Sequence, residues 1–186
     1  MKFKNKIIEC IYTRRSIREY KDKSVSKELI DELLKSAVMA PSAKNRQPLH
    51  FTIVEGKDKV RYFGEIAYKN LIMQELERKS GYGLKSAEQI FYNAPLLIII
   101  SGKKGYNWLK ADANLAVQNM FLAANSLGLG SCWIGYAMPL NNDKKVMREL
   151  GVPDDFEIVA PLIFGYLKKK IISIPKREPK ILKWIS

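Results

Sequence analysis

The chain has 186 residues, of which 47% are hydrophobic and 27% charged, and these proportions exclude a disordered tail or a collagen-like polymer. Its length predicts a single domain over residues 1–186, and its longest apolar run, seven residues at 94–100, is far below the roughly 20 that a membrane-spanning helix needs. The 32 Lys and Arg against 19 Asp and Glu give a net charge of +13, which favours anionic partners without identifying one.

The chain has only two cysteines and one histidine, which limits the kinds of catalytic or metal site that it can form. Glu9 interrupts the N-terminal apolar stretch, so no secretory signal is expected, and we predict a cytoplasmic protein. Cys10 and Cys132 form no CxxC pair, and His50 is the only histidine. A disulfide framework, a metal site and a Ser/His/Asp mechanism therefore have little support, and no metal is expected.

The first third of the chain predicts two helices, a loop and a strand. Apolar spacing indicates a helix over 3–13 and a second one that begins after the cap Ser26 and ends before Pro41. A polar loop at 42–48 follows. The β-branched and aromatic run 51–54 predicts a strand that ends in a turn.

The middle of the chain returns to helical spacing over 60–67. The glycines of 81–83 break this pattern and indicate a lid or loop, and a short helix is expected over 86–92. The run 96–100 is apolar without alternation, which predicts a strand covered on both faces.

The last third contains the most regular pattern, a wide apolar stripe that predicts a long helix over 108–127. A short strand is expected at 131–134, followed by a helix capped by Asn142. The segment 157–166 predicts a final strand, in which Pro161 indicates an edge position or a bulge.

Three basic side chains and a hydroxyl lie close together after the first helix, namely Arg14, Arg15, Ser16 and Arg18. Guanidinium groups donate paired, charge-assisted hydrogen bonds to phosphate oxygens, and a serine hydroxyl can add another. The cluster therefore indicates a phosphate site. The alternative is a solvated basic face with ordinary salt bridges to nearby acids.

The loop at 40–48 combines two prolines with the side-chain amides of Asn45 and Gln47. An amide offers an acceptor and two donors, which match the edge of a flat heteroaromatic ring. The alternative is a plain polar loop after a helix.

The third motif is Gly-Leu-Gly-Ser-Cys-Trp-Ile-Gly at 128–135. Its glycines allow a ligand to approach the backbone, and Trp133 could flank that ligand or belong to the core. The spacing is not that of a Rossmann GxGxxG motif, and nothing nearby indicates that Cys132 is an activated nucleophile.

Taken together and in this order, these motifs resemble the FMN-dependent nitroreductase family. The resemblance rests on Arg-Arg-Ser-x-Arg, Ala-Pro-Ser-Ala-x-Asn-x-Gln-Pro, Asn-Ala-Pro before a strand, the long Ala-rich helix and Gly-Leu-Gly-Ser-Cys-Trp-x-Gly. It implies an α+β fold with a central mixed sheet flanked by helices, in an intertwined homodimer that binds one FMN at each end of its interface.

The resemblance also implies which residues contact FMN. The phosphate and ribityl contacts fall on Arg14, Arg15, Ser16 and Arg18, with Arg177 and its helper Lys176 from the C-terminal segment. The loop that reaches the flavin from the other subunit corresponds to Pro41, Ser42, Ala43 and Asn45, with Gln47 beside it. The turn over the isoalloxazine corresponds to Cys132, Trp133, Ile134 and Gly135, with a backbone amide facing N5.

The family resemblance has two departures. No polar or basic residue that would touch the ring is evident at 87–90, and Leu49 stands where many relatives have tryptophan. The implied activity is a ping-pong oxidoreductase in which NADH or NADPH reduces FMN and a nitroaromatic, quinone or similar small flat acceptor reoxidises it. No side chain is expected to act as acid, base or nucleophile, whereas Lys44 and Arg46, or the cluster at 14–18, could stabilise the reduced ring.

Two alternatives remain at this point. One is a basic module that binds nucleic acid, although the aromatic residues follow core-like periodicities and do not alternate with basic ones along one strand. The other is the same fold with a different flavin task, such as flavin reduction, ring cleavage or dehalogenation. Residues 168–186 are expected to form a basic C-terminal extension; neither nucleic acid nor a membrane is the expected partner.

Overall fold

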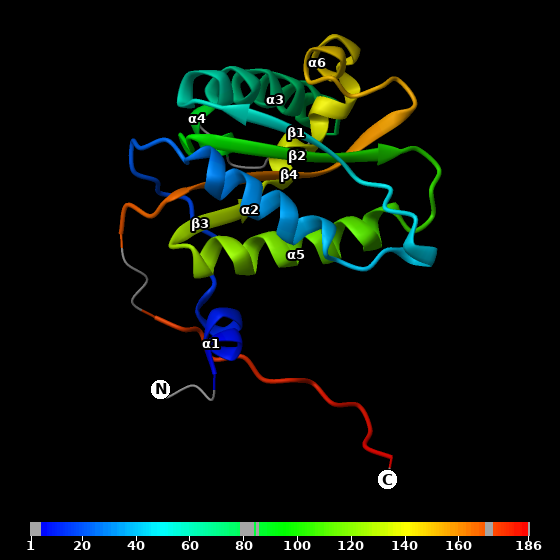
Figure 1. The fold of residues 1–186 in the computed structure, drawn as a ribbon. Helices are drawn as coiled ribbons and strands as arrows, with labels where there is room; N and C mark the ends of the chain where they lie inside the picture. Colours follow the sequence, from blue (N-terminus) through cyan, green and yellow to red (C-terminus); the bar gives the residue numbers. More distant parts are fainter. Residues whose placement is uncertain (1–4, 79–83, 85, 170–172, 186) are drawn as a thin grey trace.

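The computed structural model describes residues 5–78, 84, 86–169 and 173–185. A four-stranded sheet lies between two layers of helices, as Figure 1 shows. The elements in chain order are α1 (Lys6–Thr13), α2 (Lys27–Val38), the 3₁₀ helix η1 (Ala43–Asn45), β1 (His50–Glu55), α3 (Lys57–Arg78), α4 (Glu88–Phe91), β2 (Leu96–Lys103), α5 (Leu109–Ser126), β3 (Leu129–Trp133), the 3₁₀ helix η2 (Gly135–Asn142), α6 (Lys144–Glu149) and β4 (Phe156–Tyr166).

The sheet has the strand order β1-β2-β4-β3, and each neighbouring pair is antiparallel. The expected α+β fold with a sheet flanked by helices is confirmed. The expectation of a mixed sheet is wrong for these four strands, because the parallel pairing among the described residues is an isolated bridge between Ser16 and Ser131.

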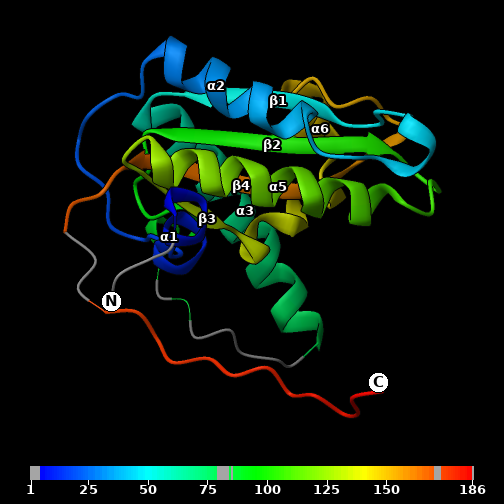
Figure 2. The same ribbon diagram turned by 60° about the horizontal axis from the view of Figure 1, so that its bottom comes forward.

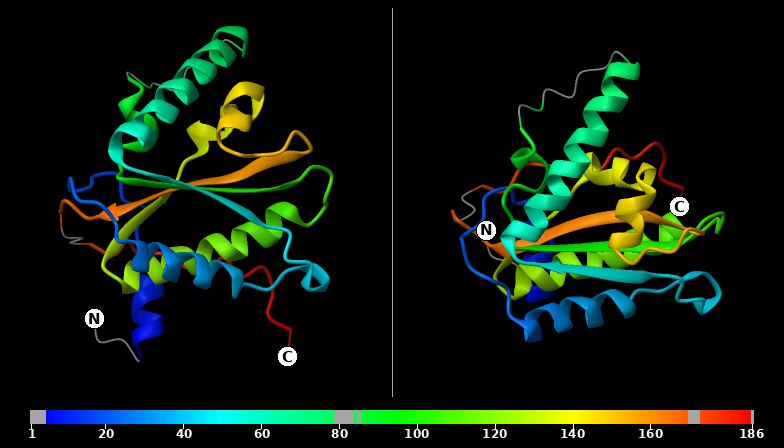
Figure 3. Two further views of the ribbon diagram at one scale, coloured as in Figure 1. Left: turned by 45° about the horizontal axis from the view of Figure 1, so that its top comes forward. Right: turned by 90° about the horizontal axis from the view of Figure 1, so that it is seen from above.

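The two faces of the sheet bury two separate apolar clusters. Leu97 and Ile99 point to the side of α3, whereas Ile98 and Ile100 point to the side of α2 and α5. These strand residues are fully buried, which confirms the sequence prediction for β2. Figure 3 shows from two further sides that the helices cover both faces of the sheet.

Pro161 lies in β4, a central strand of the sheet, so the predicted edge position is wrong. The other predicted possibility, a bulge, is found next to Pro161. The register of β4 against β2 shifts between the pairs Ile100–Ala160 and Ser101–Ile158. The Pro161 carbonyl accepts from the backbone N–H of Ile134 at 2.9 Å. Because the N–H and C=O of one residue in an antiparallel strand point to the same side, the missing donor faces the end of β3 and leaves the β2 ladder intact.

The remaining differences from the sequence prediction concern element boundaries. Asp143, not Asn142, caps α6, because its Oδ1 accepts from the backbone of Lys145 at 3.0 Å and of Val146 at 3.1 Å. Asn142 is the last residue of η2. The expected lid or loop at 81–83 lies outside the described residues.

The N-terminal helix α1 is held against α5 by polar contacts near its end. The side-chain amide of Asn125 donates to the Cys10 carbonyl at 3.1 Å and to the Thr13 hydroxyl at 3.0 Å. The apolar side chain of Ile7 nevertheless stays 70% exposed. Figure 1 shows that α1 projects beyond the layers of the sheet and helices, and Figure 2 shows the same of the extended segment at 173–185. Among the described residues, no helix has the length and apolar character required to cross a membrane.

The segment after α1 passes so close to β3 that position 130 of this strand requires glycine. A Cβ at Gly130 would lie 2.8 Å from the Ile17 Cβ. We expect Gly130→Ala to lower the free energy of unfolding by about 1–3 kcal/mol, as overpacking usually does, measured by urea denaturation. Combined with Ile17→Gly, the loss should be smaller than the sum of the two single losses. A Gly130→Ala protein that unfolds at the parent urea concentration would contradict this contact.

Candidate functional site

The segment after α1 is laid along β3, which brings the first and third sequence motifs together. The backbone N–H of Ile17 donates to the Ser131 carbonyl at 2.9 Å, next to the Ser16–Ser131 bridge. The Tyr20 hydroxyl donates to the Ile17 carbonyl at 2.6 Å, and burial raises the pKa of that hydroxyl far above its usual value. A neutral, buried Tyr20 therefore fixes this segment as it leaves the strand.

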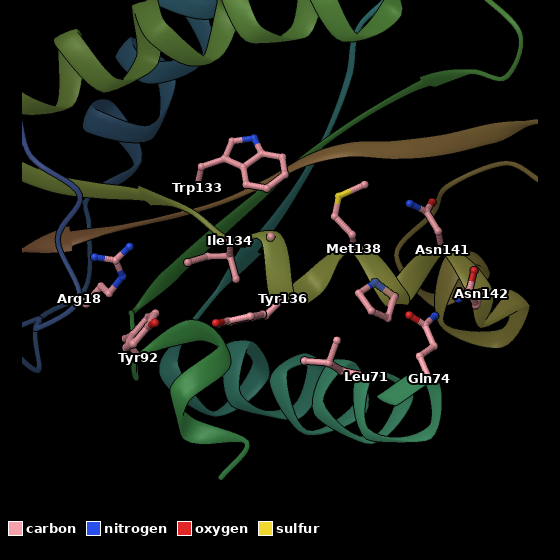
Figure 4. Close-up of a pocket in the computed structure, with 12 residues that line it drawn as sticks. Arg18, Leu71, Gln74, Tyr92, Trp133, Ile134, Tyr136, Met138, Asn141 and Asn142 are labelled. Atoms are coloured by element: carbon pink, nitrogen blue, oxygen red, sulfur yellow. The ribbon is translucent and has the colours of Figure 1, made fainter. Parts of the chain in front are cut away.

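A cavity of about 690 Å³ opens where these segments meet, and its size falls in the range of small-molecule and cofactor sites. Arg18 from the first motif and Trp133, Ile134 and Gly135 from the third line it together. Tyr92 shares the Arg18 end, with the guanidinium carbon 5.8 Å from the ring centroid. Figure 4 shows Arg18 and Tyr92 at one end of the cavity, with further lining residues Leu71, Gln74, Tyr136, Met138, Asn141 and Asn142.

The backbone at the start of η2 offers a donor to this cavity. The N–H of Ile134 is already bound to the Pro161 carbonyl, whereas Gly135 is the first residue of η2. The N–H of a first helical residue has no carbonyl one turn earlier to pair with. Since Gly135 lines the cavity, its N–H can serve a ligand acceptor there.

An arginine cluster is formed by Arg14, Arg15 and Arg177, which lie close together, and Arg18 of the same motif lines the cavity. Burial lowers the pKa of the Arg14 guanidinium, and the positive charges of Arg15 and Arg177 lower it further, against a smaller opposite effect of Cys132. Within the described residues, the ion pairs leave out Arg14, Arg15, Arg18 and Arg177. Like charges held together in this way favour an anion between them.

The guanidinium group of Arg15 is only partly satisfied. Its Nη1 donates to the carbonyls of Tyr12 at 2.8 Å and of Arg14 at 2.5 Å. Its Nε and Nη2 are buried and have no hydrogen-bond partner. Leaving such donors unmatched costs about 1–3 kcal/mol, or more for charged groups, so they indicate an acceptor supplied by a ligand or a second chain.

Cys132 lies beneath this end of the site and is 1% exposed. Burial raises the pKa of its thiol, while Arg18, the Ser16 hydroxyl and Arg14 act in the opposite direction more weakly. A neutral thiol is a poor nucleophile, which agrees with a packing role for this side chain. Among the described residues, no group of three His, Cys, Asp or Glu side chains could hold a metal ion.

The second motif forms a compact loop elsewhere in the chain. The Ser42 hydroxyl accepts from the Gln47 backbone at 2.9 Å, and Lys44, Asn45 and Gln47 all have left-handed backbone conformations, with φ of 53°, 51° and 49°. Such conformations cost on the order of 1–3 kcal/mol each and cluster at functional sites. Pro41, Ser42 and Gln47 line a separate cavity of about 130 Å³.

This loop is attached to the opposite end of α5 from the arginine cluster. The buried carboxylate of Asp112 accepts from the Ala43 backbone at 3.1 Å and from the Tyr106 hydroxyl at 3.1 Å. Asn125 holds α1 thirteen residues further along the same helix, which corresponds to about 20 Å at 1.5 Å per residue. One chain therefore does not bring the loop and the arginines to a common site, as Figure 1 also shows.

Two further parts of the predicted site are Lys176 and the ring contact that was sought at 87–90. Lys176 precedes Arg177 in the sequence and forms an ion pair with Glu178 at 2.8 Å. Tyr92 supplies the cavity wall that the sequence left unassigned at 87–90. It caps α4 with a φ of 52°, and the polar pair Tyr92-Asn93 before Ala94-Pro95 was the only sequence signal that could have singled it out.

The sequence and the fold agree on a family. The profile of the Nitroreductase family matches residues 11–166, and the chain belongs to this family. A relative from Archaeoglobus fulgidus, which carries the provisional name NADH dehydrogenase/NAD(P)H nitroreductase, is 33% identical over 87% of this chain and 85% of its own.

Two further comparisons concern FMN. The FMN reductase (NADPH) of Bacillus subtilis is 29% identical over 96% of this chain and 71% of its own. The crystal structure of a nitroreductase with bound FMN from Bacteroides fragilis is similar with a TM-score of 0.84 and 28% identity, covering 98% of this chain and 99% of the other.

The burial of Cys132 can be tested in a Cys10→Ser variant, which leaves it as the sole thiol. Because burial raises its pKa, the folded protein should react with iodoacetamide at pH 8 at least about tenfold more slowly than the urea-unfolded chain. Mass spectrometry over time measures the rate. Equal rates in the folded and unfolded states would contradict the buried, neutral thiol.

Proposed function

We propose that this protein is an FMN-dependent oxidoreductase that uses NADH or NADPH to reduce nitroaromatics, quinones or similar flat acceptors in a ping-pong cycle. The observation that carries the proposal is the arginine cluster, in which the buried Nε and Nη2 of Arg15 have no acceptor. Arg18 from the same motif lines a cavity whose wall also includes aromatic rings and Gly135. The names of the FMN-binding relatives support the same assignment.

The residues present fit FMN by their chemistry. Arg14, Arg15 and Arg177 supply positive charge and unmatched donors for its phosphate, with the exposed Ser16 hydroxyl beside them and Lys176 nearby in sequence. The ring would lie in the cavity against the backbone from Cys132 to Gly135, next to Trp133 and Ile134. When bound, FMN accepts a hydride from the nicotinamide donor and returns the electrons to the acceptor.

The protein contributes placement and charge to this cycle. Arg18 puts a positive charge at the edge of the cavity, where it stabilises negative charge that accumulates on a bound ring. The N–H of Gly135 would orient the ring by donating one hydrogen bond to it. We assign no acid, base or nucleophile among the side chains, and the raised pKa of Cys132 agrees with that assignment.

We further propose that two copies complete each site. The motif at 41–47 would reach the flavin of the other copy through Pro41, Ser42, Ala43, Asn45 and Gln47. The separation of about 20 Å along α5 supports this, because antiparallel α5 helices related by a twofold axis place the loop end of one beside the arginine end of the other. Residues 168–186 would extend over the partner as a basic arm of the single domain 1–186, since Leu182 and Trp184 are 102% and 79% exposed.

The direct test is to purify the protein and identify any bound flavin by its absorbance and mass. The proposal requires bound FMN, consumption of NADH or NADPH, and parallel initial-rate lines when donor and acceptor are varied. Colourless protein that neither takes up added FMN nor oxidises a nicotinamide would refute it.

Removing an arginine from the proposed phosphate site should weaken FMN binding. We expect Arg14→Ala, Arg15→Ala or Arg177→Ala each to cost about 1.5–3 kcal/mol, the value of one hydrogen bond to a charged group. Titration of FMN fluorescence measures the affinity. Arg61→Ala, which removes an exposed arginine paired with Asp58, is the matched control and should change nothing. Unchanged affinity in all three site variants would contradict the phosphate assignment.

The two-copy site can be tested by mixing defective chains. Arg14→Ala damages the phosphate end, and Asn45→Gly removes a loop side chain while it permits the left-handed backbone. Mixed dimers contain one site with both defects and one with neither, so unfolding and refolding the two variants together should restore about a quarter of the parental sites. A mixture that binds no more FMN than the separate variants would mean that each chain forms its own site.

A further inference from the structure

A second cavity continues from the first on the same chain. It has a volume of about 490 Å³ and lies between α3 and the start of α6. Gln74 and Asn142 line both cavities, so the two cavities adjoin at these residues, and we refer to the pair as the groove. Figure 4 shows these two residues at the end of the first cavity that is remote from Arg18 and Tyr92.

The second cavity presents hydrogen-bond donors and positive charge that the chain itself does not use. The Nδ2 of Asn70 is buried without a hydrogen-bond partner. Lys144 and Lys145 are exposed, and neither belongs to an ion pair among the described residues. Among the described residues that line the cavity, the one carboxylate is that of Asp143, and its Oδ1 accepts from two backbone N–H groups of α6.

This combination of groups selects the chemistry of a ligand. Amide N–H groups and ammonium groups donate to oxygen anions, and an orphaned buried donor gains most from a charged acceptor. The remaining wall is Met73, whose side chain is 55% exposed. The cavity therefore suits an extended anionic group, not a second flat aromatic ring.

We propose that this end of the groove binds the diphosphate of the nicotinamide donor, through Lys144, Lys145 and Asn70. The inference rests on the proposed function, in which the nicotinamide must reach a ring held against Trp133 and Gly135. Every NADH or NADPH molecule carries a diphosphate, whereas nitroaromatic and quinone acceptors need carry no anion. The groove then separates two anions, with the flavin phosphate near the arginines and the donor diphosphate at the α6 end.

The experiment compares donors that differ in their phosphates. Lys144→Ala/Lys145→Ala should lower kcat/KM for NADH and NADPH at least about tenfold through KM, because charge-assisted contacts are lost. It should leave kcat/KM for 1-benzyl-1,4-dihydronicotinamide, which has no phosphate, unchanged. Asn70→Asp should act in the same direction by adding a negative charge. Calorimetry with ADP, which carries the diphosphate without a nicotinamide, should show binding to the parent protein and its loss in the double variant.

Lys103→Ala/Lys104→Ala is the matched control, because it removes two adjacent exposed lysines outside both cavities. It should leave all donors and ADP binding unchanged. Equal losses in the control, equal losses for the phosphate-free donor, or no loss for NADH and NADPH would each overturn the diphosphate site. In these three cases the parent protein still oxidises its donors, and the proposed function stands. A parent protein that binds no FMN and oxidises no donor would instead refute the proposed function, and this inference with it.

Discussion

The site depends on one close backbone crossing, in which the segment after α1 is laid along β3. The Ile17 N–H to Ser131 carbonyl bond fixes its register, and Gly130 provides the space for it. Without this contact, the arginines that leave α1 would project from a polar surface with nothing to orient them. With it, Arg18 and the turn at Gly135 line the same cavity, although well over a hundred residues separate them in sequence.

The second constraint is the length of α5. This helix carries the buried Asp112 near its beginning, where it holds the loop at 43, and Asn125 near its end, where it holds α1. A rigid helix keeps the two apart, so their separation is a fixed property of the chain. The strained backbone of Lys44 and Asn45 thus lies far from the arginines of its own chain, and in the proposed dimer it would instead lie beside the arginines of the second copy.

Local patterns predicted most of the fold because each acted within a few residues. The uninterrupted apolar run of β2 and the stripe of α5 identified a doubly covered strand and a long helix. The N-cap of α6 was misplaced by one residue, since Asn142 and Asp143 both suit a cap and only tertiary packing of η2 decides between them. Pro161 led to the wrong prediction of an edge strand. Its position needs no N–H because it faces the end of β3, where only the Pro161 carbonyl forms a bond.

The sequence predicted those residues of the candidate site whose side-chain chemistry is distinctive. It did not predict the residues whose role depends only on where the fold places them. A cluster of arginines beside a serine indicates an anion in any fold, whereas Tyr92 acquires a role only because α4 ends in a left-handed turn beside Arg18. The same limit applies to Asn70, a commonplace helical residue until burial leaves its amide without a partner. The net charge of +13 pointed to anions in general, and the fold adds the information of where basic side chains line a cavity, namely Arg18 in one cavity and Lys144 and Lys145 in the next. The proposed reaction joins two phosphorylated cofactors, and these two groups of basic side chains would each bind the phosphate groups of one of them.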